Sequence, residues 1–181
     1  MDFPLIETSR LTLASLMVTD GSAVFSLFSD RRVMEYYDLD IFTREIEAQS
    51  WIAKHKARFD RNEGIRWAIR FKGQSRLIGT CGFNSWNQTL RTGEIGFEVS
   101  PECWGKGIAA EAVQAVVEWA FVAGMGKPLN RIIARTMLEN DASARLLLKL
   151  GFQEKEIVRG GGHWKGAFHD LRIFALASKR D

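Results

Sequence analysis

The sequence has little of what marks membrane, metal-binding or disulfide-stabilised proteins. No run approaches the ~18 uninterrupted apolar residues that a membrane-spanning helix requires, so we expect no contact with a membrane. The chain has only two cysteines, Cys81 and Cys103, and its 181 residues can build a core without a disulfide. Neither C-x-x-C nor H-E-x-x-H spacing occurs, so a metal site is not expected.

Features that would indicate export, nucleic-acid binding or several domains are also missing. Residues 1–10 lack a long apolar run and do not read as a signal peptide, so a reducing cytoplasm is the expected location. No dense Lys/Arg block with interleaved aromatics occurs, and the net charge of +3 suits an anionic small ligand without requiring nucleic acid. Because no linker, repeat or low-complexity tract interrupts the chain, residues 1–181 are predicted to form one domain.

The first half of the chain contains a strand, two helices and then three strands. Residues 10–15 alternate like a strand. Thr19 and Asp20 can then cap a helix, and Thr43 is the expected cap of a second helix, which has acidic residues in its first turn and basic residues near its end. Short connections predict an antiparallel meander of three strand-like runs, at residues 66–71, 76–83 and 93–99.

The second half alternates helices with strands. Residues 107–122 have the pattern of a strongly apolar helix, and residues 141–150 predict a shorter helix that Gly151 ends. Strands are predicted at residues 131–137, 152–158 and 171–177. The resulting order, β-α-α-β-β-β-α-β-α-β-β, predicts an α/β protein with a mixed sheet and helices packed on it.

The most informative segment is a glycine-rich turn between the strand at residues 93–99 and the apolar helix. It reads W-G-K-G-I-A from Trp104 to Ala109, and its glycines allow the backbone to turn sharply and approach a ligand. The first amides of the helix have no partner within it and lie at the positive end of its dipole. This arrangement favours phosphate or pyrophosphate, and Lys106 adds a positive charge.

Two other interpretations of this turn remain open. It can be a glycine turn without a ligand, since short glycine motifs match by chance. The letters from Gly105 to Ala110 also satisfy G-x-G-x-x-A, the fingerprint of dinucleotide-binding proteins. That fingerprint normally begins a series of βαβ units, whereas here three antiparallel strands precede it. A dinucleotide-dependent oxidoreductase is therefore the weaker alternative.

The second informative segment is L-E-N-D-A-S-A-R-L-L-L-K-L-G-F at residues 138–152. On a helix, four of its residues form one stripe: Asn140, Ser143, Leu147 and Leu150. Asn140 can cap this helix, and Ser143 can be a small packed residue. Together with the glycine turn, the segment resembles the GNAT acyl-CoA fold, and W-G-K-G is similar to the turns of the RimJ/RimL branch. E-T-S-R-L-T-L at residues 7–13, G-E-I-G-F at residues 93–97 and His169-Asp170 also resemble that branch.

The resemblance implies an N-acetyltransferase that uses acetyl-CoA as its co-substrate. The CoA pyrophosphate would bind the backbone amides of the turn, which comprises Trp104, Gly105, Lys106, Gly107, Ile108 and Ala109. The pantetheine arm would pair with the strand around Phe97, Glu98 and Val99, and Asn140 would hydrogen-bond it near the thioester. Many GNAT enzymes carry a tyrosine acid seven residues after this asparagine. Leu147 stands there in this chain, so Ser143, on the same helix face, is the expected substitute.

Acetyl transfer to an amine requires a base, because a free alkyl amine with a pKa of ~10 is mostly protonated at neutral pH. Glu94 and Glu98 lie on one face of their strand, since side chains alternate. Glu94 is the first candidate base and Glu98 the second, acting directly or through a water. Either carboxylate can instead be a surface group or part of an ion pair. The resemblance implies that the amide of Phe97 stabilises the oxyanion.

The sequence defines the acceptor side of the site less sharply. Tyr36 and Tyr37 can form a wall of the acceptor cleft or pack in the core. Residues 160–165, which read G-G-G-H-W-K, are expected to form a flexible loop, either beside the acceptor cleft or as a solvated hairpin tip. His55 is expected to be a solvated helix residue, and His169 a structural one.

The acceptor amine stays open between a protein N-terminus and a small molecule such as a polyamine, amino acid or antibiotic. A non-catalytic acyl-CoA-binding module is the alternative from another class, and the leucine at position 147 is the feature that favours it. A homodimer is compatible with the sequence.

Overall fold

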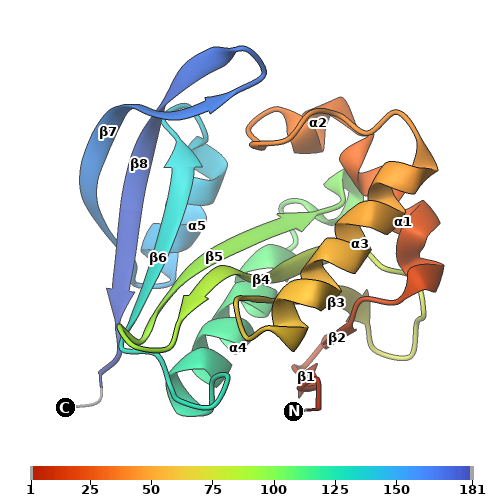
Figure 1. Ribbon diagram of the computed structural model, residues 1–181, viewed down its shortest axis with the longest axis horizontal. Helices are drawn as coiled ribbons and strands as arrows, with labels where there is room; N and C mark the ends of the chain where they lie inside the picture. The colour runs from red at the N-terminus through yellow and green to blue at the C-terminus, as the bar shows by residue number, and fades with distance from the viewer. Residues whose placement is uncertain (1, 180–181) are drawn as a thin grey trace.

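The computed structural model describes residues 2–179 and contains an eight-stranded sheet with helices on both of its faces (Figure 1). The strands are β1 (Ile6–Glu7), β2 (Leu11–Ser15), β3 (Ile65–Phe71), β4 (Gly79–Asn87), β5 (Thr92–Val99), β6 (Arg131–Met137), β7 (Gln153–Trp164) and β8 (Ala167–Ala177). Their order across the sheet is β1-β2-β3-β4-β5-β6-β8-β7. Every neighbouring pair is antiparallel except β5 and β6, which are parallel. The predicted mixed sheet is confirmed.

The five α-helices of the described chain divide between the two faces of the sheet. They are α1 (Gly21–Phe28), α2 (Arg31–Met34), α3 (Glu45–Asp60), α4 (Ile108–Val122) and α5 (Asp141–Lys149). Helices α1 and α3 cover one face, and α4 and α5 lie on the other (Figure 1). Within residues 2–179, none of these helices combines the length and the apolar character that crossing a membrane would take.

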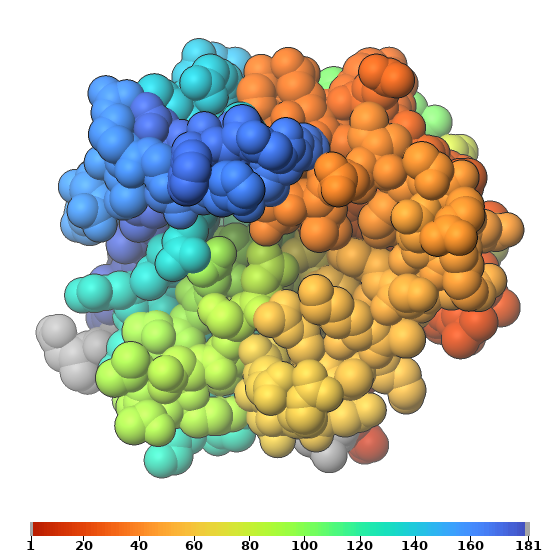
Figure 2. Space-filling view, turned by 45° about the horizontal axis from the view of Figure 1, so that its top comes forward, coloured from red at the N-terminus to blue at the C-terminus, as the bar shows by residue number. Residues whose placement is uncertain are grey.

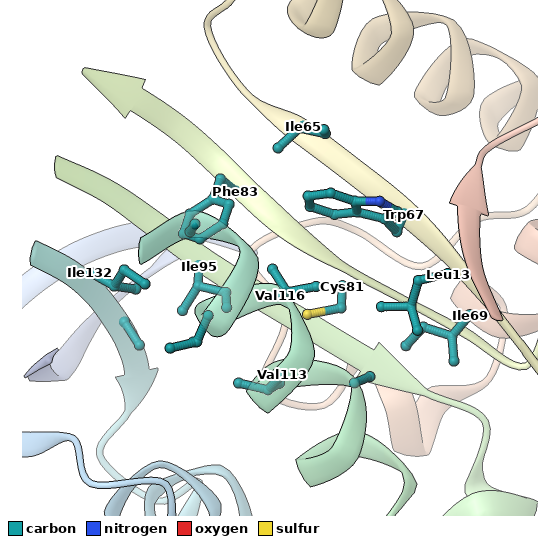
Figure 3. Close-up of a cluster of buried hydrophobic side chains, with 14 of the residues drawn as sticks. Leu13, Ile65, Trp67, Ile69, Cys81, Phe83, Ile95, Val113, Val116 and Ile132 are labelled. Atoms are coloured by element: carbon teal, nitrogen blue, oxygen red, sulfur yellow. The ribbon is translucent and has the colours of Figure 1, made fainter. Parts of the chain in front are cut away.

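The main hydrophobic core lies between the sheet and α4. Alternate residues of the central strands point toward this helix, including Trp67, Cys81, Phe83 and Ile95 (Figure 3). Val113 and Val116 of α4 complete the layer, and a smaller cluster packs α1 and α3 on the opposite face. Cys81 and Cys103 are both buried and free. The sheet is therefore held rigidly from both sides, which fixes the strand ends that carry the candidate site.

Of the two predicted helix caps, Asp20 stands at the N-cap position of α1 without a side-chain capping bond, and Thr43 is not the cap of its helix. The Asp20 carboxylate makes no capping bond to α1, because it accepts from the Met17 amide and forms an ion pair with Arg70. A short 3₁₀ turn, Val18–Asp20, leads into α1 instead. Helix α3 begins at Glu45, and the predicted cap, Thr43, lies outside it. There the Glu47 side chain accepts hydrogen bonds from the backbone amides before the helix, so the acidic first turn was predicted correctly.

The predicted bounds agree within one residue for β3 and β5 and match residues 131–137 for β6. The middle strand of the meander, β4, starts three residues later and ends four residues later than the predicted run 76–83. Two short elements were not predicted: the two-residue strand β1 and the four-residue helix α2. Neither is long enough to show a hydrophobic period, so only tertiary contacts define them.

Of the two expectations for residues 160–165, the loop is wrong and the exposed hairpin is closer to the structure. Strand β7 continues to Trp164, and a tight turn at Lys165 and Gly166, both with positive φ, joins it to β8. The register of the pair shifts between Val158 and Gly162, where β7 carries two more residues than β8. Gly160, with a φ of +57°, lies in this bulge. The glycines thus allow a kink within a long hairpin.

Candidate active site

Strands β5 and β6 diverge and form a V-shaped opening in the sheet. Their parallel pairing runs from Thr92↔Arg131 to Ile95↔Ala134 and then ends. Beyond that point β6 stays paired with β8 up to Met137, while β5 stays paired with β4 up to Val99. Figure 1 shows the two arrows spreading from a shared base. Apart from the Val99 carbonyl, which accepts a hydrogen bond from Trp104 Nε1, the facing backbone groups of the two spread strands are therefore open to pairing with a ligand.

The glycine turn lies at the open end of β5. A 3₁₀ turn, Pro101–Cys103, leads into it, and Gly105 and Gly107 adopt left-handed φ values of +72° and +74°. The first hydrogen bond of α4 runs from the Glu111 amide to the Gly107 carbonyl, so the amides between them have no helical acceptor. The surrounding residues, Trp104–Gly107, are exposed. This geometry fits an anion at the positive end of the α4 dipole.

Two residues that the sequence analysis did not select hold this turn in place. Arg10, at the start of β2, donates from Nε to Glu111 at 2.6 Å and from Nη1 to the Lys106 carbonyl at 2.9 Å. Burial raises the pKa of Glu111, but hydrogen bonds from Thr8, Arg10 and Ser9 outweigh it and hold the pKa at about 2. The Glu111 charge is thus balanced by Arg10. No local pattern could have revealed a pair separated by 101 positions.

The face of β5 that points away from α4 carries both candidate bases, as the alternation predicted. Glu94 is partly exposed and pairs with Arg135 of β6 at 3.1 Å. Gly96 follows on the same face and leaves room for the Asn84 amide, whose Nδ2 lies 2.9 Å from where a β-carbon at Gly96 would be. The first candidate base therefore lies at the border of the V, where solvent or an amine can reach it.

Glu98 is in a different environment, because it belongs to a buried polar cluster. Arg66 of β3 donates to both carboxylate oxygens of Glu98, to Thr80 at 2.8 Å and to Asn84 at 3.0 Å. Burial raises the pKa of Tyr37, and the negative charge of Glu98 raises it further. Both charges of the pair are almost completely buried. Sequence analysis did not select Arg66, although a strand arginine flanked by apolar residues is a signal for a buried ion pair.

Helix α5 closes the V on the side of α4. The Asn140 side chain caps this helix by accepting a hydrogen bond from the Ser143 amide at 3.1 Å, which confirms the capping interpretation. Ser143 is half-buried, and no hydrogen bond of its hydroxyl to another residue within 2–179 is observed. Leu147 is completely buried in the main core. The predicted stripe therefore runs from a polar helix start into the core.

The hairpin of β7 and β8 reaches across to α2. Lys165, at its tip, donates a hydrogen bond from Nζ to the Met34 carbonyl. The hairpin and α2 border a hollow of about 600 Å³ that Arg31, Arg32, Met34, Glu35, Asp40, Ile41 and Lys165 line. In Figure 2 the blue hairpin meets the orange segment that contains α2, above the recessed green strands. The hollow has cationic and acidic walls.

Tyr36, Tyr37 and the histidines occupy distinct places. Tyr37 packs against Phe28 in the smaller core, with ring centroids 5.2 Å apart. Tyr36 is half-buried, and its partial burial raises its pKa, as do the carboxylates of Glu35, Glu139 and Asp141. The expectation for His55 is wrong, because it is buried against Trp51 with centroids 4.2 Å apart. His169 stacks on Trp164 in the hairpin.

The part of the chain that the structure describes does not contain a cluster of metal-ligand side chains. No group of three or more His, Cys, Asp or Glu side chains among residues 2–179 is placed to hold a metal ion. The arrangement instead combines an anion-binding turn, free strand edges and a reachable carboxylate. These features suit transfer of a group from a long, phosphate-bearing carrier to a nucleophile.

Comparisons with known proteins agree with this arrangement. Residues 10–153 match the family model described as an acetyltransferase (GNAT) domain. The uncharacterized N-acetyltransferase YoaA of Bacillus subtilis (strain 168) is 37% identical over 179 residues, which cover 99% of each chain. An acetyltransferase (GNAT family) from Bacillus anthracis has a TM-score of 0.84 and 26% identity, covering 96% of this chain and 98% of that chain.

A more distant structure shares the fold alone. The apo form of RimL, a ribosomal L7/L12 alpha-N-protein acetyltransferase, has a TM-score of 0.87 at 17% identity. The match covers 98% of this chain and 96% of that chain.

Proposed function

Since the chain belongs to the GNAT family of acetyl-CoA-dependent N-acetyltransferases, we propose that it acetylates a primary amine by direct attack on the thioester. The observation that carries the proposal is the glycine turn at the open end of the V between β5 and β6. An anion site and two free strand edges lie in succession, in the order that the phosphates and the pantetheine arm of one ligand need. The family match includes the turn, which leaves the dinucleotide interpretation without support.

In this proposal the backbone amides of residues 104–109 hold the CoA pyrophosphate. Those at the start of α4 have no acceptor within the helix, and a side chain at Gly105 or Gly107 would be strained at a positive φ. Arg10 donates a hydrogen bond to the Lys106 carbonyl of the turn and forms an ion pair with Glu111. The Glu111 carboxylate near the phosphates is therefore already compensated by a positive charge. Lys106 adds a positive charge at the surface.

The pantetheine arm then extends into the V along β5. Phe97, Glu98 and Val99 follow the last β5–β6 pair. The Val99 carbonyl already accepts a hydrogen bond from Trp104 Nε1 at 2.9 Å, so the backbone of Phe97 is the part of this segment that we propose pairs with the amides of the arm. The Asn140 carbonyl oxygen already caps α5, and its Nδ2 makes no hydrogen bond within residues 2–179. This donor is therefore free for the arm. The amide of Phe97 is the proposed oxyanion donor.

Glu94 is the proposed base, either directly or through a water. It is partly exposed, and its partner Arg135 is half-exposed, so an incoming ammonium group can compete for the carboxylate. Glu98 is the second candidate, but its carboxylate is buried and already accepts hydrogen bonds from Arg66 and Thr80. Protonating it would leave the buried Arg66 charge unpaired, which is costly. We therefore assign Glu98 a role in holding β3, β4 and β5 together.

Ser143 is the proposed donor to the leaving thiolate. Its hydroxyl lies in the first turn of α5, beside the capping Asn140, whereas Leu147 offers no polar atom. A thiol has a pKa of ~8.5, so a thiolate can also leave without a full proton transfer. The proposed acceptor is a protein N-terminus or a small-molecule amine that enters near the hollow between α2 and the hairpin. Tyr36 directly follows Glu35, which lines this hollow.

An acetylation screen tests the proposal. Purified protein is incubated with acetyl-CoA and separate panels of N-terminal peptides and small amines, and released CoA is measured with a thiol reagent. We expect CoA release that depends on one class of amine. If acetyl-CoA binds but no panel releases CoA above the rate of hydrolysis, the chain acts as an acyl-CoA-binding module instead.

A further inference from the structure

Thr136 of β6 carries a buried hydroxyl that has no partner in the protein. The residue is 7% exposed, and its Oγ1 makes no hydrogen bond to any described residue. Burying a hydroxyl without a partner destabilises a fold, so native structures rarely retain one without another use for it. No irregularity of the strand accounts for the unpaired hydroxyl, because the backbone of Thr136 is in regular register with Arg172 of β8.

The position of Thr136 relative to the V is specific. The last β5–β6 pair involves Ala134, so Thr136 is the second residue beyond the point where β6 loses β5 as its neighbour. That spacing corresponds to about 7 Å along a strand. By alternation its side chain lies on the same face as Ile132 and Ala134, which pack in the main core toward α4 and α5. The hydroxyl thus borders the inner end of the V.

The ligand proposed above would bring its reactive end to this place, so the inference rests on the proposed function. The glycine turn follows the C-terminal end of β5 and holds the pyrophosphate, so the pantetheine arm must run from there toward the apex of the V. Its thioester is then the group closest to the apex. Among the core residues that α5 supplies, Ala144 and Leu147 are apolar and cannot meet a polar atom of the ligand.

We propose that Thr136 Oγ1 donates a hydrogen bond to the thioester sulfur of acetyl-CoA, in addition to the one proposed for Ser143, and stabilises the thiolate as it leaves. The amine nitrogen forms a bond to the acetyl carbon, the carbon–sulfur bond breaks, and sulfur keeps that electron pair. The proton lost by the amine goes to Glu94 or to water. Thr136 keeps its own proton, since an aliphatic hydroxyl is too weak an acid to give it up, and it acts through a charge-assisted hydrogen bond.

The test compares Thr136→Val, which removes the hydroxyl with little change in shape, with Thr136→Ser, which keeps it. In the free protein we expect Thr136→Val to melt no lower than the wild type, because an unsatisfied buried group is removed. Its kcat should fall roughly ten- to hundredfold, the range for a hydrogen bond to a charged group. Thr136→Ser should keep most of the activity.

A second measurement separates a contact to sulfur from a general packing effect. Binding of CoA and of desulfo-CoA, which lacks the sulfur, is compared in all three proteins. The wild type and Thr136→Ser should prefer CoA, and this preference should be clearly smaller in Thr136→Val, where Ser143 is the remaining proposed donor. An unchanged preference and an unchanged kcat in Thr136→Val would refute the role of Thr136 while leaving the acetyltransferase assignment intact. A wild type that neither binds CoA nor acetylates any amine would refute both.

Discussion

At the scale of single residues, Glu94 is the carboxylate that the mechanism depends on most. Glu94→Gln should lower kcat with little effect on acetyl-CoA affinity, because a base acts on the amine and not on the donor. The loss should shrink at high pH, where more of the amine is already neutral. A pH profile of kcat for both proteins measures this.

Arg135→Gln is the matched control, since it frees Glu94 from its ion pair and keeps the carboxylate. It should retain the activity that Glu94→Gln loses. If Glu94→Gln has the wild-type rate at pH 7 under conditions where chemistry limits turnover, the base is a water or another group.

Ser143 is tested by removing its hydroxyl. If Ser143 donates a proton to the thiolate, Ser143→Ala should lower kcat by roughly 10²–10⁴-fold, the usual contribution of a positioned acid. The Asn140 cap should persist, because the hydrogen bond of Ser143 comes from its backbone amide. Ser26→Ala is a suitable control, as that hydroxyl donates within α1, away from the V. A loss smaller than about threefold would leave Ser143 with a binding role only.

At the scale of elements, the glycine turn carries the donor site. Gly107→Val should abolish acetyl-CoA binding, because a side chain at this αL position strains the turn and blocks the approach to its amides. Gly73→Val is the matched control, since Gly73 has the same φ of +74° in the turn between β3 and β4. Both variants should lose stability, by about 1–2 kcal/mol from the left-handed strain. Titration calorimetry should show that only Gly107→Val loses binding; normal binding by that variant would move the donor site elsewhere.

Sequence patterns predicted those elements whose signals are local. The glycine turn, the Asn140 cap and strand β6 all depend on residues within a few positions, and their bounds agree closely with the structure. Strand β7 was predicted too short, because three consecutive glycines read as a loop. Their function as a bulge depends on pairing with β8, which is a tertiary property.

The ion pairs that hold the site in place could not be predicted from the sequence, because they too depend on tertiary contacts. Arg10 and Glu111 are brought together only when β2 lies beside the start of α4, and Arg66 meets Glu98 only across three strands. Glu98 accordingly looked equivalent to Glu94 in the sequence, although one is buried and the other partly exposed. Alternation places residues on a face, but it does not state what covers that face.

At the scale of the whole molecule, ligand binding should stabilise the folded chain against heat. At a concentration of acetyl-CoA 100-fold above its Kd, the added stability is about 2.7 kcal/mol. For a chain of this size that raises the Tm by roughly 5–11 °C. NAD and ATP should have little effect, since neither carries the pantetheine arm that fills the V. Equal stabilisation by NAD in a thermal-shift assay would contradict the assignment of the donor site.

Acid should unfold the molecule partly through His55. Burial lowers the pKa of His55 to about 3, and the nearby charge of Arg66 adds to the effect, against 6.5 for an ordinary histidine. The unfolded chain therefore binds a proton that the folded chain excludes, so stability is complete above pH 6.5 and is lost as the pH falls toward 3. The free energy of unfolding should fall by up to about 1.4 kcal/mol per pH unit from this group.

His55→Phe keeps a ring against Trp51 and should flatten the pH dependence of the free energy of unfolding, measured in urea, between pH 6.5 and 3. His163→Gln, on the exposed hairpin, serves as the control and should leave the slope unchanged. If His55→Phe shows the same slope as the wild type, His55 is not the group that links protonation to unfolding.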